Sequence, residues 1–113
     1  MYRYRRCVVP GDVIEQAGRR IAAAARTRAR VVLFGSHARG DGGPDSDLDF
    51  LVIEQDVDDR HGEMVRLGRE VRSLGVPIDI VVISEAHAAE WADVEGSMVH
   101  AALTEGRELD AAA

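Results

Sequence analysis

The chain is organised around residues 33–40, LFGSHARG, and residues 45–53, DSDLDFLVI. In each stretch an apolar run meets a polar turn: the first run ends at a Gly-Ser pair, and the second carries Asp47 and Asp49 at its head. The N–H groups of a Gly-Ser turn can bind an anion. Two carboxylates one residue apart can share a divalent cation. The two stretches therefore predict a phosphate-binding turn beside a pair of metal ligands.

The length and composition limit the class of protein. With 113 residues, of which 46% are hydrophobic, the chain is expected to form one domain over residues 1–113. Its formal charge of −6 argues against direct nucleic-acid binding, which usually needs a basic surface. A single cysteine, Cys7, and no apolar run near the roughly 20 residues of a membrane span fit a cytoplasmic protein. Residues 1–10 fit an edge strand or a flexible arm.

Hydrophobic periodicity predicts a small α/β or α+β domain. Helices are expected over residues 12–27 and 57–74 and from Ser84 to Gly106, and strands over residues 30–34, 47–54 and 76–83. Asp12 with Glu15 fits a capping box at the first helix, and Gly75 fits the end of the second. Gly96 and Ser97 indicate a bend, or a break into two helices, in the third.

Two further features concern the strands and the end of the first helix. The strands over residues 47–54 and 76–83 are apolar on both faces beyond their aspartates, which predicts central positions in the sheet. Arg26, Arg28 and Arg30 gather where the first helix should end, and cations stabilise a helix C-terminus. All fourteen basic residues are arginines, so phosphate contacts must come from arginine or backbone N–H groups.

Three aspartates are the candidate metal ligands. Asp47 and Asp49 should project from the same face of a strand, with Cα atoms roughly 6.5–7 Å apart. Asp79 lies near the start of another apolar strand, where an ionised carboxylate is rarely buried without a partner. If the two strands are neighbours, Asp79 completes a three-aspartate cluster. The alternatives are that Asp45 and Asp47 are ordinary turn or cap residues at the start of a strand, and that Asp79 pairs with a nearby arginine.

The candidate phosphate ligands are Gly35, Ser36 and Arg39. Glycine permits close approach of the backbone to a ligand, and serine offers a hydroxyl group and a helix cap. The guanidinium of Arg39 suits phosphate or carboxylate. An ion pair of Arg39 with Asp41 or Asp45 is the equal alternative.

Gly35-Ser36, ten intervening residues and Asp47-Leu48-Asp49 resemble the signature of the DNA polymerase β-like nucleotidyltransferase superfamily. Residues 34–40 together with 46–49 look like its minimal nucleotidyltransferase (MNT) branch. The resemblance covers nearly the whole chain. It implies a polymerase β-like fold, in which helices pack on a small mixed β-sheet.

The resemblance also implies roles for individual residues in nucleotidyl transfer with two Mg²⁺ ions and ATP as the donor. Gly35 and Ser36 would hold the β- and γ-phosphates. Asp47 and Asp49 would bind both metals, and Asp79 would bind the catalytic metal and help activate the acceptor hydroxyl. No catalytic role is expected for His37.

Some MNT proteins are antitoxins that transfer AMP to a tyrosine of a partner HEPN-domain toxin. The first hypothesis is therefore a protein adenylyltransferase that acts as the antitoxin of such a pair. One alternative is the subunit of an antibiotic-modifying nucleotidyltransferase, and the other is an antitoxin that neutralises its partner by binding alone. A homo-oligomer or hetero-oligomer is compatible with each hypothesis.

Overall fold

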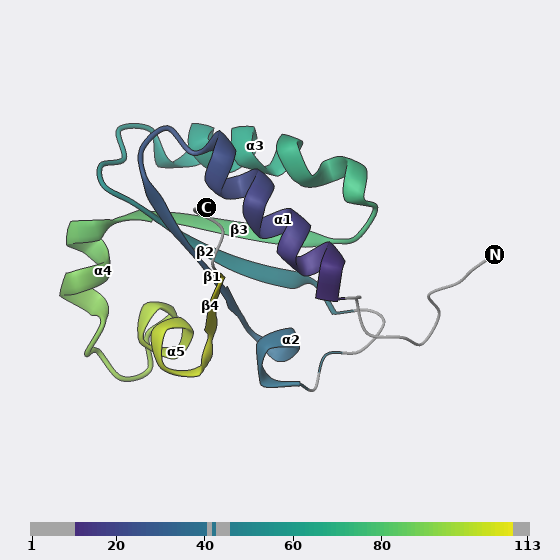
Figure 1. The fold of residues 1–113 in the computed structure, drawn as a ribbon. Helices are drawn as coiled ribbons and strands as arrows, with labels where there is room; N and C mark the ends of the chain where they lie inside the picture. Colours follow the sequence, from purple (N-terminus) through teal and green to yellow (C-terminus); the bar gives the residue numbers. More distant parts are fainter. Residues whose placement is uncertain (1–10, 41, 43–45, 110–113) are drawn as a thin grey trace.

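The computed structural model describes residues 11–40, 42 and 46–109 (Figure 1). The expectations for residues 1–10 and for Asp41 and Asp45 lie outside the described residues. The elements follow one another as α1 (Gly11–Ala24), β1 (Ala29–Phe34), α2 (Ser36–Arg39), β2 (Leu48–Glu54), α3 (Arg60–Val71), the 3₁₀ turn η1 (Arg72–Leu74), β3 (Ile78–Ser84), α4 (Glu85–Trp91), α5 (Met98–Glu105) and β4 (Arg107–Leu109). None of the helices in this part of the chain has the length and apolar character of a membrane span.

The four strands form one mixed sheet in the order β3-β2-β1-β4. Strand β2 runs parallel to β3 and antiparallel to β1, and β1 runs antiparallel to β4. The C-terminal end of β1 therefore lies next to the N-terminal ends of β2 and β3. The α/β class with a mixed sheet is confirmed, and the three stretches that carry the candidate site residues meet at one end of the sheet.

Strand β3 departs from the prediction because it lies at the edge of the described sheet, whereas β2 is central as expected. The apolar character of β3 comes from its two faces. Ile80 and Val82 pack in one core cluster with residues of α3, and Ile83 packs in the other with Ala88 of α4. Coverage by helices on both faces makes a strand apolar even where one of its edges has no neighbouring strand.

Each face of the sheet has its own core cluster and its own pair of helices. Figure 1 shows α1 and α3 over one face and α4 and α5 on the other. In β2, Leu48 and Phe50 face the α1–α3 side, whereas Leu51 and Ile53 face the α4–α5 side. Because side chains alternate along a strand, Asp49 belongs to the α4–α5 face.

The start and end of α1 differ from the prediction. Helix α1 begins at Gly11, so Asp12 lies inside the first turn and is not the cap. The helix ends at Ala24, because the backbone N–H of Arg26 donates to Glu63 Oε2 at 3.1 Å and turns the chain toward α3. Arg30 lies in β1, where its guanidinium pairs with Glu108 Oε1 of β4 at 3.0 Å. Arg26 and Arg30 therefore bind carboxylates on other elements.

The stop and cap signals of the later helices are confirmed. Gly75 follows η1 with a left-handed φ of 76°, which glycine adopts at low cost. Ser84 Oγ accepts the N–H of His87 at 3.1 Å and begins α4, and Ser97 Oγ accepts the N–H of His100 at 3.1 Å and begins α5. The predicted third helix is thus two helices, separated at Gly96 and Ser97.

Strand β4 was not predicted. It has three residues, of which only Leu109 is buried, so its sequence carries no recognisable period. Leu109 packs against α1 at Gly18, where a Cβ atom would lie 2.6 Å from Leu109 Cδ1. Strand β4 is therefore defined by a contact with α1 and by pairing with β1, both distant in sequence.

Candidate active site

Asp49 and Asp79 are direct partners across the parallel β2–β3 pair. Both side chains project from the α4–α5 face, beyond the end that those helices cover. Asp49 is half-buried and Asp79 is exposed. The two strands that carry the aspartates are neighbours, which was the condition for a three-aspartate cluster. The position of Asp79 is therefore explained without an ion pair to an arginine.

Asp47 reaches the same place from just outside the sheet. Strand β2 begins at Leu48, so Asp47 is the exposed residue before the strand and not its first member. Its carboxyl group lies close enough to Asp79 to raise the pKa of that residue, in addition to the larger effect of burial. The structure thus brings together the three predicted aspartates from two strands and one turn.

The electrostatics of this cluster show an excess of negative charge. Partial burial raises the pKa of Asp49, and the charges of Asp79 and Asp47 raise it further, although His37 and Arg39 oppose the shift. Burial raises the pKa of Asp79 as well, together with the hydrogen bond and charge of Asp47. A bound cation would remove this mutual repulsion and favour the ionised form of both groups.

Gly35 lies against this cluster and has a conformation that other residues rarely adopt. Its φ is 79°, and a Cβ atom at this position would overlap the Asp49 carboxylate. The cause is the register of the sheet, which pairs Phe34 with Asp49 and brings the next residue of the chain over the carboxylate. The glycine turn and the aspartate cluster are therefore parts of one site.

Ser36 and Arg39 lie on the single turn of helix α2 that follows Gly35. Ser36 is its first residue, and the N–H of Gly40 donates to Ser36 O and ends the turn. Arg39 is exposed, with Nη1 3.9 Å from Glu105 Oε1 of α5, and its charge lowers the pKa of Asp49. Arg39 is thus close enough to the cluster to act on an anion bound there.

His37 contributes in a way that the sequence did not indicate. Its Nε2 lies 3.2 Å from the carbonyl oxygen of Ser46, and a Cβ atom at Gly42 would lie 2.7 Å from its Nδ1. The imidazole therefore ties α2 to the segment that carries Asp47. Only its position inside the motif could have drawn attention to it, because its partner is a backbone oxygen, which any residue supplies.

The aspartates fit Mg²⁺ by donor chemistry. Carboxylate oxygens are hard ligands, and Mg²⁺ in nucleotide sites is usually held by one or two carboxylates with phosphate oxygens and water. The described residues contain no group of three or more His, Cys, Asp or Glu side chains that could hold a metal ion by themselves. A Mg²⁺ ion held by Asp47, Asp49 or Asp79 would therefore need phosphate oxygens and water as further ligands.

Comparison with known families identifies the class of domain. Residues 16–105 match the family described as a nucleotidyltransferase domain. The matched range includes α2 and all three aspartates, and the polymerase β-like fold of this family agrees with the mixed sheet described above. A search of curated proteins found no match to the chain.

Proposed function

Because the chain belongs to the nucleotidyltransferase domain family, we propose that it transfers AMP from ATP to a hydroxyl group of a partner protein. The observation that carries this proposal is the meeting of Asp49, Asp79 and Gly35 at one end of the sheet. It places a carboxylate cluster and a backbone turn open to phosphate within one site.

The residues divide the work of the reaction. The backbone at Gly35 and Ser36, with the guanidinium of Arg39, would hold the phosphates, and Asp47, Asp49 and Asp79 would hold Mg²⁺. Bound Mg²⁺ supplies charge neutralisation and alignment of the reacting oxygens. The acceptor oxygen attacks the α-phosphorus, the bond from that phosphorus to the bridging oxygen of pyrophosphate breaks, and Asp79 takes the hydroxyl proton.

A protein acceptor is favoured by the exposure of the site. Asp47 and Asp79 are both exposed, so a tyrosine on the surface of another protein can reach them. The resemblance to minimal nucleotidyltransferases suggests a HEPN-domain toxin as this partner, with the chain acting as its antitoxin. Modification of the toxin would then neutralise it.

The test is a transfer assay with the full chain, Mg²⁺ and ATP labelled on the α-phosphate, in the presence of the product of the adjacent gene. We expect label on a tyrosine of the partner, release of pyrophosphate, and loss of both with Asp47→Asn or Asp79→Asn. Asp93→Asn is the matched control, because Asp93 is an exposed acid in the turn after α4, outside the site.

Three outcomes would contradict parts of the proposal. Absence of both label and pyrophosphate release would exclude transferase activity under these conditions. Label on an aminoglycoside and none on protein would indicate an antibiotic-modifying enzyme. If Asp47→Asn and Asp79→Asn still neutralise the partner fully, neutralisation results from binding alone.

A further inference from the structure

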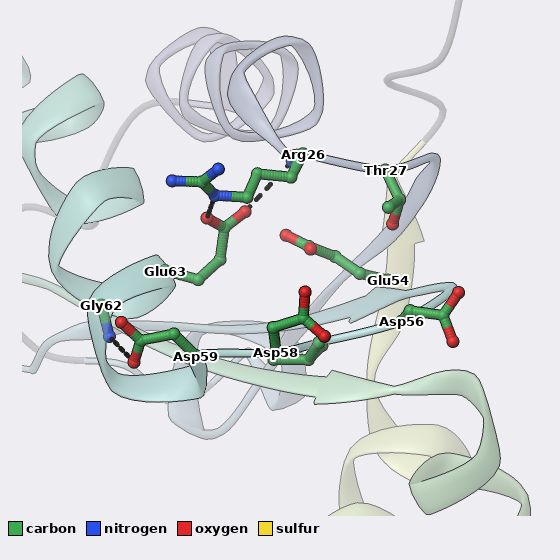
Figure 2. Close-up of a pocket in the computed structure, with 9 residues that line it drawn as sticks. Arg26, Thr27, Glu54, Asp56, Asp58, Asp59, Gly62 and Glu63 are labelled. Atoms are coloured by element: carbon green, nitrogen blue, oxygen red, sulfur yellow. Dashed lines mark hydrogen bonds and ion pairs between the residues drawn. The ribbon is translucent and has the colours of Figure 1, made fainter.

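A pocket lies at the end of β2 opposite to the aspartate cluster. It has a volume of about 390 Å³, within the range of small-ligand pockets. Figure 2 shows it between the turn after α1, the end of β2 and the start of α3. Asp49 is the second residue of β2 and Glu54 is its last, so the two sites are roughly 16 Å apart along the strand.

The lining of this pocket is strongly acidic. It carries five carboxyl groups and one arginine, on Arg26, Glu54, Asp56, Asp58, Asp59 and Glu63. Asp59 is occupied, because its Oδ1 caps α3 by accepting the N–H of Gly62 at 2.9 Å. Among the described residues, no hydrogen bond or ion pair joins Asp56 or Asp58 to another group, so both carboxylates are available to a ligand.

Glu54 is the second indication of a ligand. It is only 1% exposed, and its Oε2 has no hydrogen-bond partner among the described residues. Figure 2 shows its carboxyl group extending from the strand into the space between Glu63 and Asp58. A buried acceptor without a donor costs about 1–3 kcal/mol, so an N–H group delivered to it would be favourable.

Glu63 shows which donors this wall of the pocket accepts. It is 4% exposed, and its oxygens accept from Arg26 Nε at 3.2 Å and from Arg66 Nη2 at 2.8 Å. Arg66 Nη2 also donates to Ala24 O at 2.6 Å. Two guanidinium groups thus already bind one of the carboxylates of the pocket, whereas Glu54 beside it has none.

We propose that this pocket binds an organic cation with a guanidinium or primary ammonium group, which donates N–H groups to Glu54 Oε2 and to the carboxylates of Asp56 and Asp58. The carboxylates of this pocket do not form a group that could hold a metal ion by themselves. The several N–H groups of a guanidinium can reach acceptors that are further apart.

Proton release should accompany binding of the cation. Burial raises the pKa of Glu54 to about 8, and the neighbouring Glu63 acts in the same direction, against Arg66 and Arg26. Without a ligand, Glu54 therefore holds a proton at neutral pH. A cation at Oε2 favours the ionised form, so binding at pH 7 should release close to one proton.

The experiment is calorimetric titration of the full chain with agmatine and with (4-hydroxybutyl)urea, a neutral analogue of nearly the same shape in which urea and hydroxyl groups replace the guanidinium and ammonium groups. We expect agmatine to bind at least about tenfold more tightly than the analogue, and Glu54→Gln to weaken agmatine binding by about tenfold. Asp58→Asn, on an exposed residue, should weaken binding without a risk to folding. Glu95→Gln, an exposed acid remote from the pocket, is the control.

Two further arms complete the test. Titration in two buffers of different ionisation enthalpy measures proton release, which Glu54→Gln should abolish. A capped Gly-Arg-Gly peptide that binds as well as agmatine would identify the source as a protein side chain, and weaker binding would identify a free amine. Equal binding of agmatine and its neutral analogue, no binding of agmatine, or unchanged binding in both Glu54→Gln and Asp58→Asn would overturn the proposal.

Discussion

The two ends of β2 place acidic groups in opposite settings. At its start, Asp49 lies half-buried beside Asp47 and Asp79, and their repulsion is left for a ligand to relieve. At its end, Glu54 is buried with a pKa raised to about 8, beside Glu63, which two arginines bind. One strand thus carries a cluster of aspartates at its start and, at its end, a buried carboxyl group whose neighbour is already paired with arginine. The difference shows that a raised pKa alone does not reveal how a carboxyl group is paired.

The largest expected effect is on catalysis at the start of the strand. Asp49→Asn should lower nucleotidyl transfer by at least about 10³-fold, because it removes one of the proposed metal ligands. The free energy of unfolding should stay the same or rise, since the substitution removes repulsion within the cluster. Initial rates of label transfer and chemical denaturation measure the two quantities. A clear loss of stability would show that Asp49 serves the fold.

The end of the strand should respond in the opposite way. Glu63→Ala should lower the free energy of unfolding by about 3 kcal/mol, because it leaves Arg66 without its buried partner and frees the turn at Arg26. Transfer by the folded fraction should be unchanged. Glu70→Ala, on an exposed position of the same helix, is the control for denaturation. An equal loss in both variants would contradict the role given to Glu63.

A pair of glycines separates close approach from backbone strain. Gly35 and Gly40 both have a left-handed φ, of 79° and 87°, but only at Gly35 would a Cβ atom overlap Asp49. Both alanine variants should lose about 1–2 kcal/mol of stability. Gly35→Ala should also lower transfer by about 100-fold, whereas Gly40→Ala should not. Similar activity in the two variants would show that Gly35 serves the turn alone.

The smallest expected effect is a pH dependence of stability. The pKa of Glu54 is raised from 4.5 to about 8, so its contribution to stability is complete below pH 4.5 and is lost as the pH rises to about 8. Burial would raise the pKa of Glu63, but hydrogen bonds with Glu54, Arg66 and Arg26 lower it to about 2, so its contribution is lost as the pH falls below 4.5.

Chemical denaturation between about pH 5 and 8 tests the part of this pH dependence of stability that Glu54 causes. The free energy of unfolding should fall by on the order of 2 kcal/mol over this range, and Glu54→Gln should remove most of that fall. Glu95→Gln provides the matched background. A slope that survives in Glu54→Gln would assign the titration to another group.

The parts of the molecule that depend on short-range patterns could be predicted from the sequence. The Gly-Ser turn, the aspartates and the Gly96–Ser97 break each have a local chemical reason, and the structure places them as expected, with Asp79 beside Asp49. The acidic pocket could not be predicted in this way. Its members are ordinary surface acids in the sequence, and they gather only because Arg26 and Glu63 join two helices that lie far apart along the chain.

The pairing of β1 with β4 also determines when the sheet can be completed during synthesis of the chain. Leu33 lies opposite Arg107 and Val31 opposite Leu109, so β1 cannot complete its second row of hydrogen bonds until almost the whole described chain has been synthesised. During translation the outer edge of β1 and the surface of α1 at Gly18 would stay uncovered until Leu109 has been added. Contacts of such sequence separation slow folding and leave strand edges open to wrong partners. The three residues of β4 therefore protect the edge of β1 only after they have been synthesised.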